Sequence, residues 1–146
     1  MKKLGMLLMA FVLVGCSSSK DVSMTAESET LKSDVTLKVK DDKVVGWTEK
    51  DVIPMSKEEL DKSYGSLYAQ FANSKQVPGV TFEYDHNGKE VVINIDVDFS
   101  KTEGEIVKDY YSYLENSATS LIFKSEDKGV SVIKELLESQ GSYKTK

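Results

Sequence analysis

Residues 80–99, VTFEYDHNGKEVVINIDVDF, predict a hairpin of two antiparallel strands. Apolar and polar residues alternate on both sides of Asn87-Gly88, and this dipeptide between alternating segments is a strong hairpin signal. A two-residue type I′ loop places apolar side chains opposite each other in three pairs: Tyr84 with Val91, Phe82 with Ile93, and Val80 with Ile95. Turn chemistry and hydrophobic pattern therefore agree on one register, with one face of the hairpin directed into a core.

A similar unit precedes this hairpin. Residues 34–40 alternate as a half-buried strand, Asp41-Asp42-Lys43 predicts a three-residue turn, and residues 44–53 return as a second strand. The register expected from that turn consists of the pairs Leu37 with Trp47 and Val39 with Val45. A helix follows, because Ser56-Lys57-Glu58-Glu59 forms a capping box. Its apolar stripe consists of Leu60, Tyr64, Leu67, Tyr68 and Phe71.

The same kind of helix follows residues 80–99. It begins at a second capping box, Thr102-Glu103-Gly104-Glu105, and its stripe consists of Ile106, Tyr110, Tyr113 and Leu114. Equivalent positions of the two units lie 46 residues apart, which fits a duplication and fits two independent ββα units equally well. Either origin predicts an α+β fold, in which two ββα units form an antiparallel sheet with helices on one face. A C-terminal helix, capped by Ser131 and ended by Gly141, completes it.

The composition limits the classes of function. The chain has 146 residues, of which 40% are hydrophobic, enough for one globular domain. Its formal net charge is −5, and all 19 of its basic residues are lysines. Recognition of nucleic acids and phosphates relies on basic patches and arginine forks, so no nucleic-acid partner is expected. The single Cys excludes an internal disulfide and a thiolate zinc site, and no cofactor is expected.

The N-terminal segment predicts export. Lys2 and Lys3 precede an apolar run at residues 4–14, the length of a signal-peptide core and too short to span a bilayer. The run ends in Leu13-Val14-Gly15-Cys16, which resembles the lipobox of bacterial lipoproteins. This resemblance implies cleavage between Gly15 and Cys16 and a diacylglyceryl group on the Cys16 sulfur. The expected division is a signal peptide at 1–15, a lipidated and flexible tether at 16–30, and one α+β domain at 31–146. The domain would be anchored at the outer face of the cell membrane, or at an outer membrane if one exists.

From about Leu31 to its end, the chain resembles the YehR-like family of small bacterial lipoproteins. The motifs that carry the resemblance are Lys40-Asp41-Asp42-Lys43-Val44, Ser56-Lys57-Glu58-Glu59, Gly79-Val80-Thr81, Val97-Asp98-Phe99-Ser100 and Lys128-Gly129-Val130-Ser131. The usual ending of the family has an aromatic residue directly after the helix-stopping Gly, whereas this chain has Gly141-Ser142-Tyr143. The resemblance implies an α+β lipoprotein fold and carries over no catalytic residue.

Few residues are candidates for a functional site. Asp96 and Asp98 lie with Asn94 on the outward face of their strand, where carboxylate oxygens could hold a hard cation such as calcium. The competing interpretation is an ordinary solvated sheet face. Tyr111 lies off the stripe of its helix, which indicates either a contact residue or a scattered surface aromatic. His86 is interpreted as an exposed turn residue, because a general base needs a partner and a sheltered cleft.

No nucleophile-elbow, phosphate-loop or metalloprotease motif is present in the sequence. The favoured function is therefore a membrane-anchored, non-enzymatic module that binds an envelope protein or peptide. The alternative is a lipoprotein that binds a small ligand or a divalent cation and delivers it to a transporter. An enzyme would require an acidic pair such as Asp96 and Asp98 inside a cleft rather than on an open face.

Overall fold

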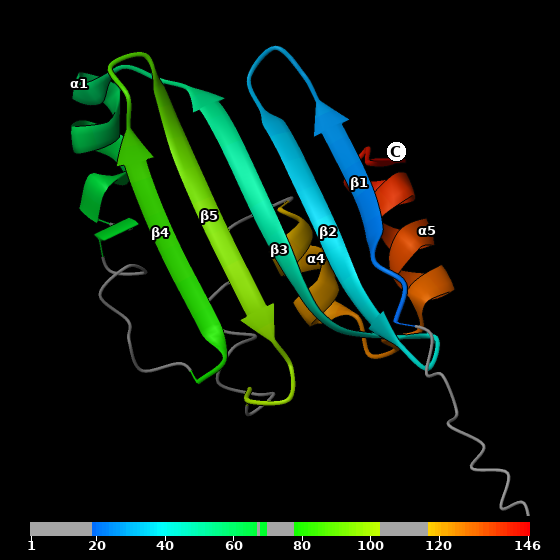
Figure 1. Cartoon of the computed structure of the whole chain (residues 1–146). Helices are drawn as coiled ribbons and strands as arrows, with labels where there is room; N and C mark the ends of the chain where they lie inside the picture. Colours follow the sequence, from blue (N-terminus) through cyan, green and yellow to red (C-terminus); the bar gives the residue numbers. More distant parts are fainter. Residues whose placement is uncertain (1–18, 67, 70–77, 103–116) are drawn as a thin grey trace, which may run out of the picture.

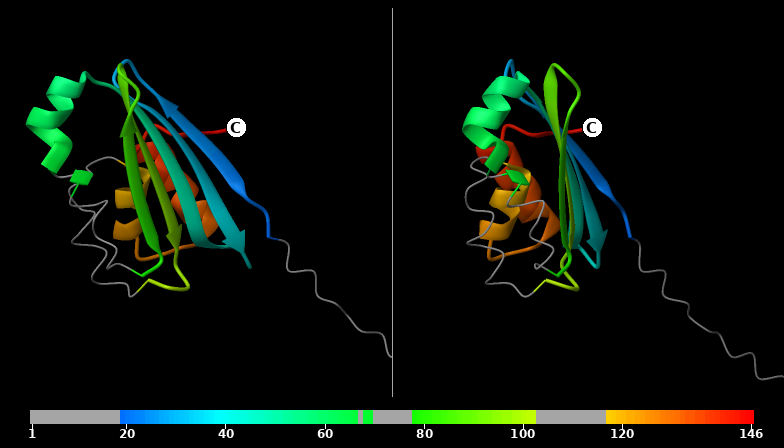
Figure 2. Two further views of the ribbon diagram at one scale, coloured as in Figure 1. Left: turned by 60° about the vertical axis from the view of Figure 1, so that its left-hand side comes forward. Right: turned by 90° about the vertical axis from the view of Figure 1, so that its left-hand side faces the viewer.

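A computed structural model describes residues 19–66, 68–69, 78–102 and 117–146. Their centre is a six-stranded sheet in the order β4-β5-β3-β2-β1-β6, in which every pairing is antiparallel. The strands are β1 Val22–Glu27, β2 Lys32–Lys40, β3 Lys43–Pro54, β4 Val80–His86, β5 Glu90–Asp98 and β6 Lys144–Thr145. The helices are α1 Lys57–Glu59, the π-helix η1 Leu60–Tyr64, α4 Ala118–Lys124 and α5 Val130–Gln140. These helices lie on one face of the sheet (Figures 1 and 2), which confirms the predicted α+β class.

Strand β1 corrects the predicted extent of the tether. Val22–Glu27 was expected to be flexible, yet it pairs with β2 along its whole length and with β6 on its other side. Met24 is fully buried and Ala26 almost so, and both alternate with polar neighbours. The strand went unrecognised because its inward residues include only one large apolar side chain. The folded domain therefore begins near Val22 rather than at residue 31.

The first hairpin turns more tightly than expected. Asp41 and Asp42 both have positive φ, 51° and 59°, as a two-residue type I′ turn requires. The predicted pair of Leu37 with Trp47 is confirmed. The predicted pair of Val39 with Val45 is wrong, because Val39 lies opposite Val44 and the register shifts at this point. The extra residue of this bulge, Val45, is 38% exposed.

The second hairpin turns more loosely than expected. His86 pairs with Val91, so four residues separate the two members of this last cross-strand pair, and only Gly88 among them has a positive φ. The Asn87 side chain holds this loop, because its Oδ1 accepts hydrogen bonds from the Lys89 and Glu90 N–H groups. The observed apolar pairs are Tyr84–Ile93, Phe82–Ile95 and Val80–Val97. The predicted register is therefore wrong by two residues, a shift that leaves every side chain on its predicted face.

The helix ends agree only partly with the prediction. The capping box at Ser56 is confirmed, since its side chain accepts from the Glu59 N–H and the Glu59 carboxylate accepts from the Ser56 N–H. Helix α5 ends at Gly141 as predicted, but its N-cap is Gly129 and not Ser131. Helix α4, which Ser117 caps, was not predicted. The second capping box and its helix, residues 102–114, fall mostly outside the described residues.

The core lies between the sheet and the helices. Trp47 is its centre: its ring contacts Phe99 and Phe123 edge-on, at centroid distances of 4.8 and 4.9 Å. The indole N–H donates to Thr119 Oγ1 over 2.9 Å, so a large aromatic side chain is buried without an unpaired donor. Tyr68 packs against Tyr84 at the other end of the same face. Within the described residues no helix is both long enough and apolar enough to cross a membrane.

Candidate functional site

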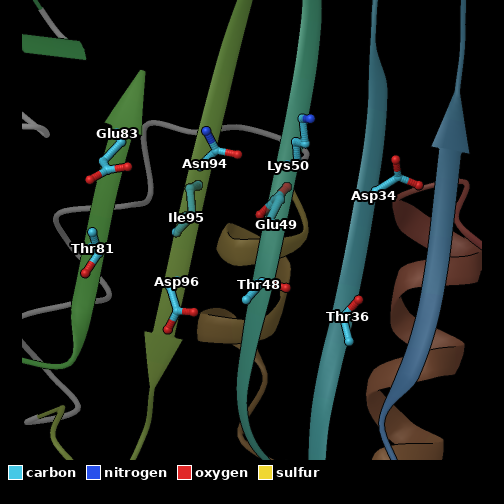
Figure 3. Close-up of a pocket in the computed structure, with 10 residues that line it drawn as sticks. All are labelled: Asp34, Thr36, Thr48, Glu49, Lys50, Thr81, Glu83, Asn94, Ile95 and Asp96. Atoms are coloured by element: carbon cyan, nitrogen blue, oxygen red, sulfur yellow. The ribbon is translucent and has the colours of Figure 1, made fainter. Parts of the chain in front are cut away.

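The face of the sheet opposite the helices is open and polar, and its middle forms a shallow pocket of about 400 Å³ (Figure 3). Because β5 inserts between β3 and β4, cross-strand neighbours form two rows across the sheet. The charged row consists of Asp34, Lys50, Asn94 and Glu83. The hydroxyl row consists of Thr36, Thr48, Asp96 and Thr81. Neighbouring strands lie about 4.8 Å apart, so each row presents a polar group at about that interval.

Several charges of this face are already neutralised. Lys38 Nζ lies 3.2 Å from an Asp96 oxygen, and Lys146 forms an ion pair with Asp34. The Lys146 hydrogen bond holds the pKa of Asp34 below its ordinary value. Within the described part of the chain, Lys50 and Glu83 have no ion-pair partner. Within the charged row, one cation and one anion therefore remain free, on either side of Asn94.

The two predicted cation ligands line one shallow pocket, but each carboxylate is engaged by a lysine. Asp96 engages Lys38, whereas Asp98 accepts hydrogen bonds from the Ser100 N–H and hydroxyl and forms an ion pair with Lys101 over 3.0 Å. The Ser100 hydroxyl, with Lys101, lowers the pKa of Asp98 to about 2. Among the described residues, no three His, Cys, Asp or Glu side chains are grouped so that they could hold a metal ion. Gly15, Cys16 and Tyr111, the other predicted site residues, lie outside the described residues.

His86 is not the exposed turn residue that the sequence suggested. It is the last residue of β4 and is half-buried. Its Nδ1 accepts from the Gly88 N–H, so Nε2, which lies 2.9 Å from the Met55 carbonyl oxygen, is the protonated nitrogen. Both ring nitrogens therefore hold the end of β3 against the β4–β5 turn.

A buried carboxyl pair lies on the helix side of β3. Glu49 and Asp51 are only 2% and 7% exposed, on the face that also carries Trp47. Glu49 accepts hydrogen bonds from the Ala118 and Thr119 N–H groups over 2.8 and 2.7 Å, which fixes the start of α4 against the sheet. Burial raises the pKa of Glu49, and the hydrogen bonds from these two amides and from Tyr143 oppose the rise, so Glu49 is the member of the pair whose charge is better stabilised.

Asp51 is the member that keeps its proton. Burial raises the pKa of Asp51 to about 8, and the nearby Glu49 charge adds to this effect. Its Oδ1 has no hydrogen-bond partner, unlike the well-satisfied Glu49 oxygens. Tyr143 closes the cluster: its hydroxyl lies 2.8 Å from Ser33 Oγ and donates to Glu49 over 3.4 Å. Burial also raises the pKa of Tyr143.

Sequence reasoning missed this pair although a signal was available. The predicted pairing of Leu37 with Trp47 directs Trp47 into the core, and side chains two and four residues further along a strand share its face. Glu49 and Asp51 therefore had to face inward as well. The pair connects three segments that are distant in sequence, because it touches β2, the start of α4 and the C-terminal tail.

Two solved structures are similar to this fold. One is the NMR structure of a protein from Streptococcus pneumoniae TIGR4, with a TM-score of 0.62 and 12% identity, covering 100% of this chain and 96% of that chain. The other is the NMR structure of the E. coli YehR protein, with a TM-score of 0.66 and 16% identity, covering 89% of this chain and 92% of that chain. No family model and no curated protein matches the sequence. At these identities the likeness shows the fold alone, which supports the expected YehR-like fold.

Proposed function

We propose that this chain is an exported lipoprotein, anchored by lipid on Cys16, and that its domain is a non-enzymatic module whose open face binds a protein or peptide of the cell envelope. The observation that carries the proposal is that charged side chains of that face have no ion-pair partner within the described structure. The charged row retains a free cation and a free anion beside an amide, above a pocket that no described helix covers (Figures 2 and 3). Such groups can contact a partner without first breaking an existing ion pair.

The anchor is tested by Cys16→Ala in the cell that makes the protein. Wild type should fractionate with membranes and label with a radioactive fatty acid, because two or more acyl chains hold a protein stably at a bilayer. Cys16→Ala should lose the label and leave the membrane fraction. Exported Cys16→Ala that remains with membranes would contradict anchoring by this residue.

The binding role is tested by cross-linking in intact cells. A photoreactive residue at Thr48, in the middle of the open face, should capture a partner, and one at Lys134, on helix α5, serves as the matched control. We expect the same cross-linked species in repeated experiments at Thr48 only. Equal capture at both positions, or none above an unrelated lipoprotein, would contradict a binding role for the open face.

The alternative of a divalent-cation site is tested by thermal unfolding with calcium. A ligand that binds only the folded state raises the unfolding midpoint. Asp96 and Asp98 each engage a lysine, and a cation would have to displace both lysines. We therefore expect no calcium-specific rise at 5 mM. A rise that Asp96→Asn abolishes would favour the cation site over the peptide or protein partner.

A further inference from the structure

The charged row contains two opposite charges at a fixed separation. Lys50 on β3 and Glu83 on β4 are both neighbours of Asn94 on β5, so they lie two strand spacings apart, about 10 Å between backbones. All three side chains project from the open face (Figure 3). The Lys50 and Glu83 side chains do not bridge this gap to form an ion pair within the described structure. From Lys50 to Glu83, the row is therefore first positive, then amide-bearing, then negative.

We propose that the charged row binds a free short peptide of two or three residues, with its carboxylate on Lys50, its ammonium on Glu83 and a backbone amide on Asn94. The inference rests on the proposed binding role of the open face and names the ligand class. Each residue of an extended peptide spans about 3.5 Å, so the ends of a di- or tripeptide are about 7–10 Å apart and match the row. A single amino acid is too short to reach both charges.

The surrounding side chains suit a peptide backbone. Thr48 and Thr81 lie in the hydroxyl row, one pleat away from the charged row, and a hydroxyl can both donate to a carbonyl and accept from an N–H. Asn94 offers both functions in one side chain. No aromatic side chain lines the pocket, so the chemistry favours polar backbone groups over stacked rings or large apolar side chains. The peptide would lie across the strands rather than along them.

The neighbouring charges do not compete for the ligand. Asp34, the other carboxylate beside Lys50, is held by Lys146, and Asp96 is held by Lys38. Within the row, the ligand's carboxylate therefore meets one available cation. Because exposed ion pairs are weak in water, we expect a Kd of about 1 mM for a peptide with small side chains.

The test titrates the folded domain with trialanine and follows backbone amide signals by NMR. We expect shifts at Thr48, Asn94 and Thr81 that saturate. Each charged contact that is lost should weaken binding about tenfold. Alanine alone, which reaches only one of the two charges, should therefore bind about tenfold more weakly, and trialanine capped at both ends about a hundredfold more weakly. Lys50→Gln and Glu83→Gln should each weaken trialanine binding about tenfold. Lys40→Gln at the end of β2 and Glu27→Gln at the end of β1, which change exposed residues outside the row, should not.

Three results would overturn the proposal. One is the absence of saturable shifts up to 10 mM trialanine, and another is binding that Lys50→Gln and Glu83→Gln leave unchanged. The third is a dimer in sedimentation that the single charge reversals Lys50→Glu and Glu83→Lys abolish and their combination restores, because a second copy would then occupy the row. If trialanine does not bind while a photoreactive residue at Thr48 still captures an envelope protein, only the proposed ligand class is wrong. Failure of both would remove the proposed binding role as well.

Discussion

Replacing Asp51 with Asn should make the domain more stable at neutral pH and change how its stability depends on pH. In the folded protein Asp51 keeps its proton up to about pH 8, whereas in the unfolded chain it loses the proton near its ordinary value of 3.8. Between these values Asp51 holds its proton in the folded state but not in the unfolded state, so its contribution to stability is greatest below about pH 3.8 and is lost as pH rises toward 8. The loss is about 1.4 kcal/mol per pH unit, or about 4 kcal/mol at pH 7.

An Asn at this position does not ionise and keeps the shape of the protonated carboxyl. We therefore expect Asp51→Asn to raise the free energy of unfolding by about 4 kcal/mol more at pH 7 than at pH 4. Urea denaturation at pH 4, 5.5 and 7 measures it. The fluorescence of Trp47 is a clean signal, because it is the only Trp of the chain and is fully buried.

The readout is the pH dependence and not the stability at one pH. An amide in place of a carboxyl can shift the stability of the folded state by a constant amount, and such a shift cancels in the comparison between pH values. Asp61→Asn, which changes an exposed aspartate paired with Lys57, is the matched control and should follow wild type in parallel. A constant difference between Asp51→Asn and wild type from pH 4 to pH 7 would show that Asp51 is ionised in the fold and refute the reasoning.

Three further predictions concern the cap, the tail and the acidic end of β5. Gly141→Ala would place a Cβ 2.5 Å from the Tyr143 ring. We therefore expect urea denaturation to show a free energy of unfolding about 2 kcal/mol lower, and NMR to show faster exchange of the buried Tyr143 hydroxyl proton with water. An unchanged urea midpoint would contradict this close packing. Ser56→Ala removes the capping box and should cost about 1 kcal/mol, whereas Ser56→Asp, which can still cap, should cost less. An NMR titration of the Asp98 carboxyl should give a pKa of about 2. Ser100→Ala should raise this pKa toward 3.8, because it removes the hydroxyl that donates to the carboxylate. An unchanged pKa would show that Ser100 does not stabilise the carboxylate.

Local alternation predicted most of the sheet because it depends only on which face each residue occupies. The register of the hairpin at residues 80–99 was wrong by two residues, yet Phe82 and Ile95 still face the core, since a shift of two preserves the face. Strand β1 was missed because its inward residues, Val22, Met24 and Ala26, alternate with polar ones but include only one large apolar side chain. Helix α4 was missed for a similar reason: its buried residues include Thr119 and Ser120.

The candidate site could be predicted only in part. Asp96 was identified from its alternation on β5, but its partner Lys38 lies on β2, beyond β3. That proximity follows from the order of the strands in the sheet, which alternation along one strand does not determine. The free charges of Lys50 and Glu83 depend on the same order. Which acidic groups are neutralised is therefore a property of the assembled sheet.

The early start of β1 limits how far from the membrane the open face could lie. With lipid on Cys16, as proposed, Val22 follows the lipidated residue by six positions, and a fully extended chain of that length spans about 20 Å at most. The connection between the lipid and the domain is therefore short. Val22 lies at the same end of the sheet as the β2–β3 turn (Figure 1), and this end would point toward the bilayer. Lys50 lies seven residues along β3 from Lys43, about 24 Å higher. The short connection would thus keep this end of the sheet close to the bilayer, while the charged row lies farther along β3 from the attachment point.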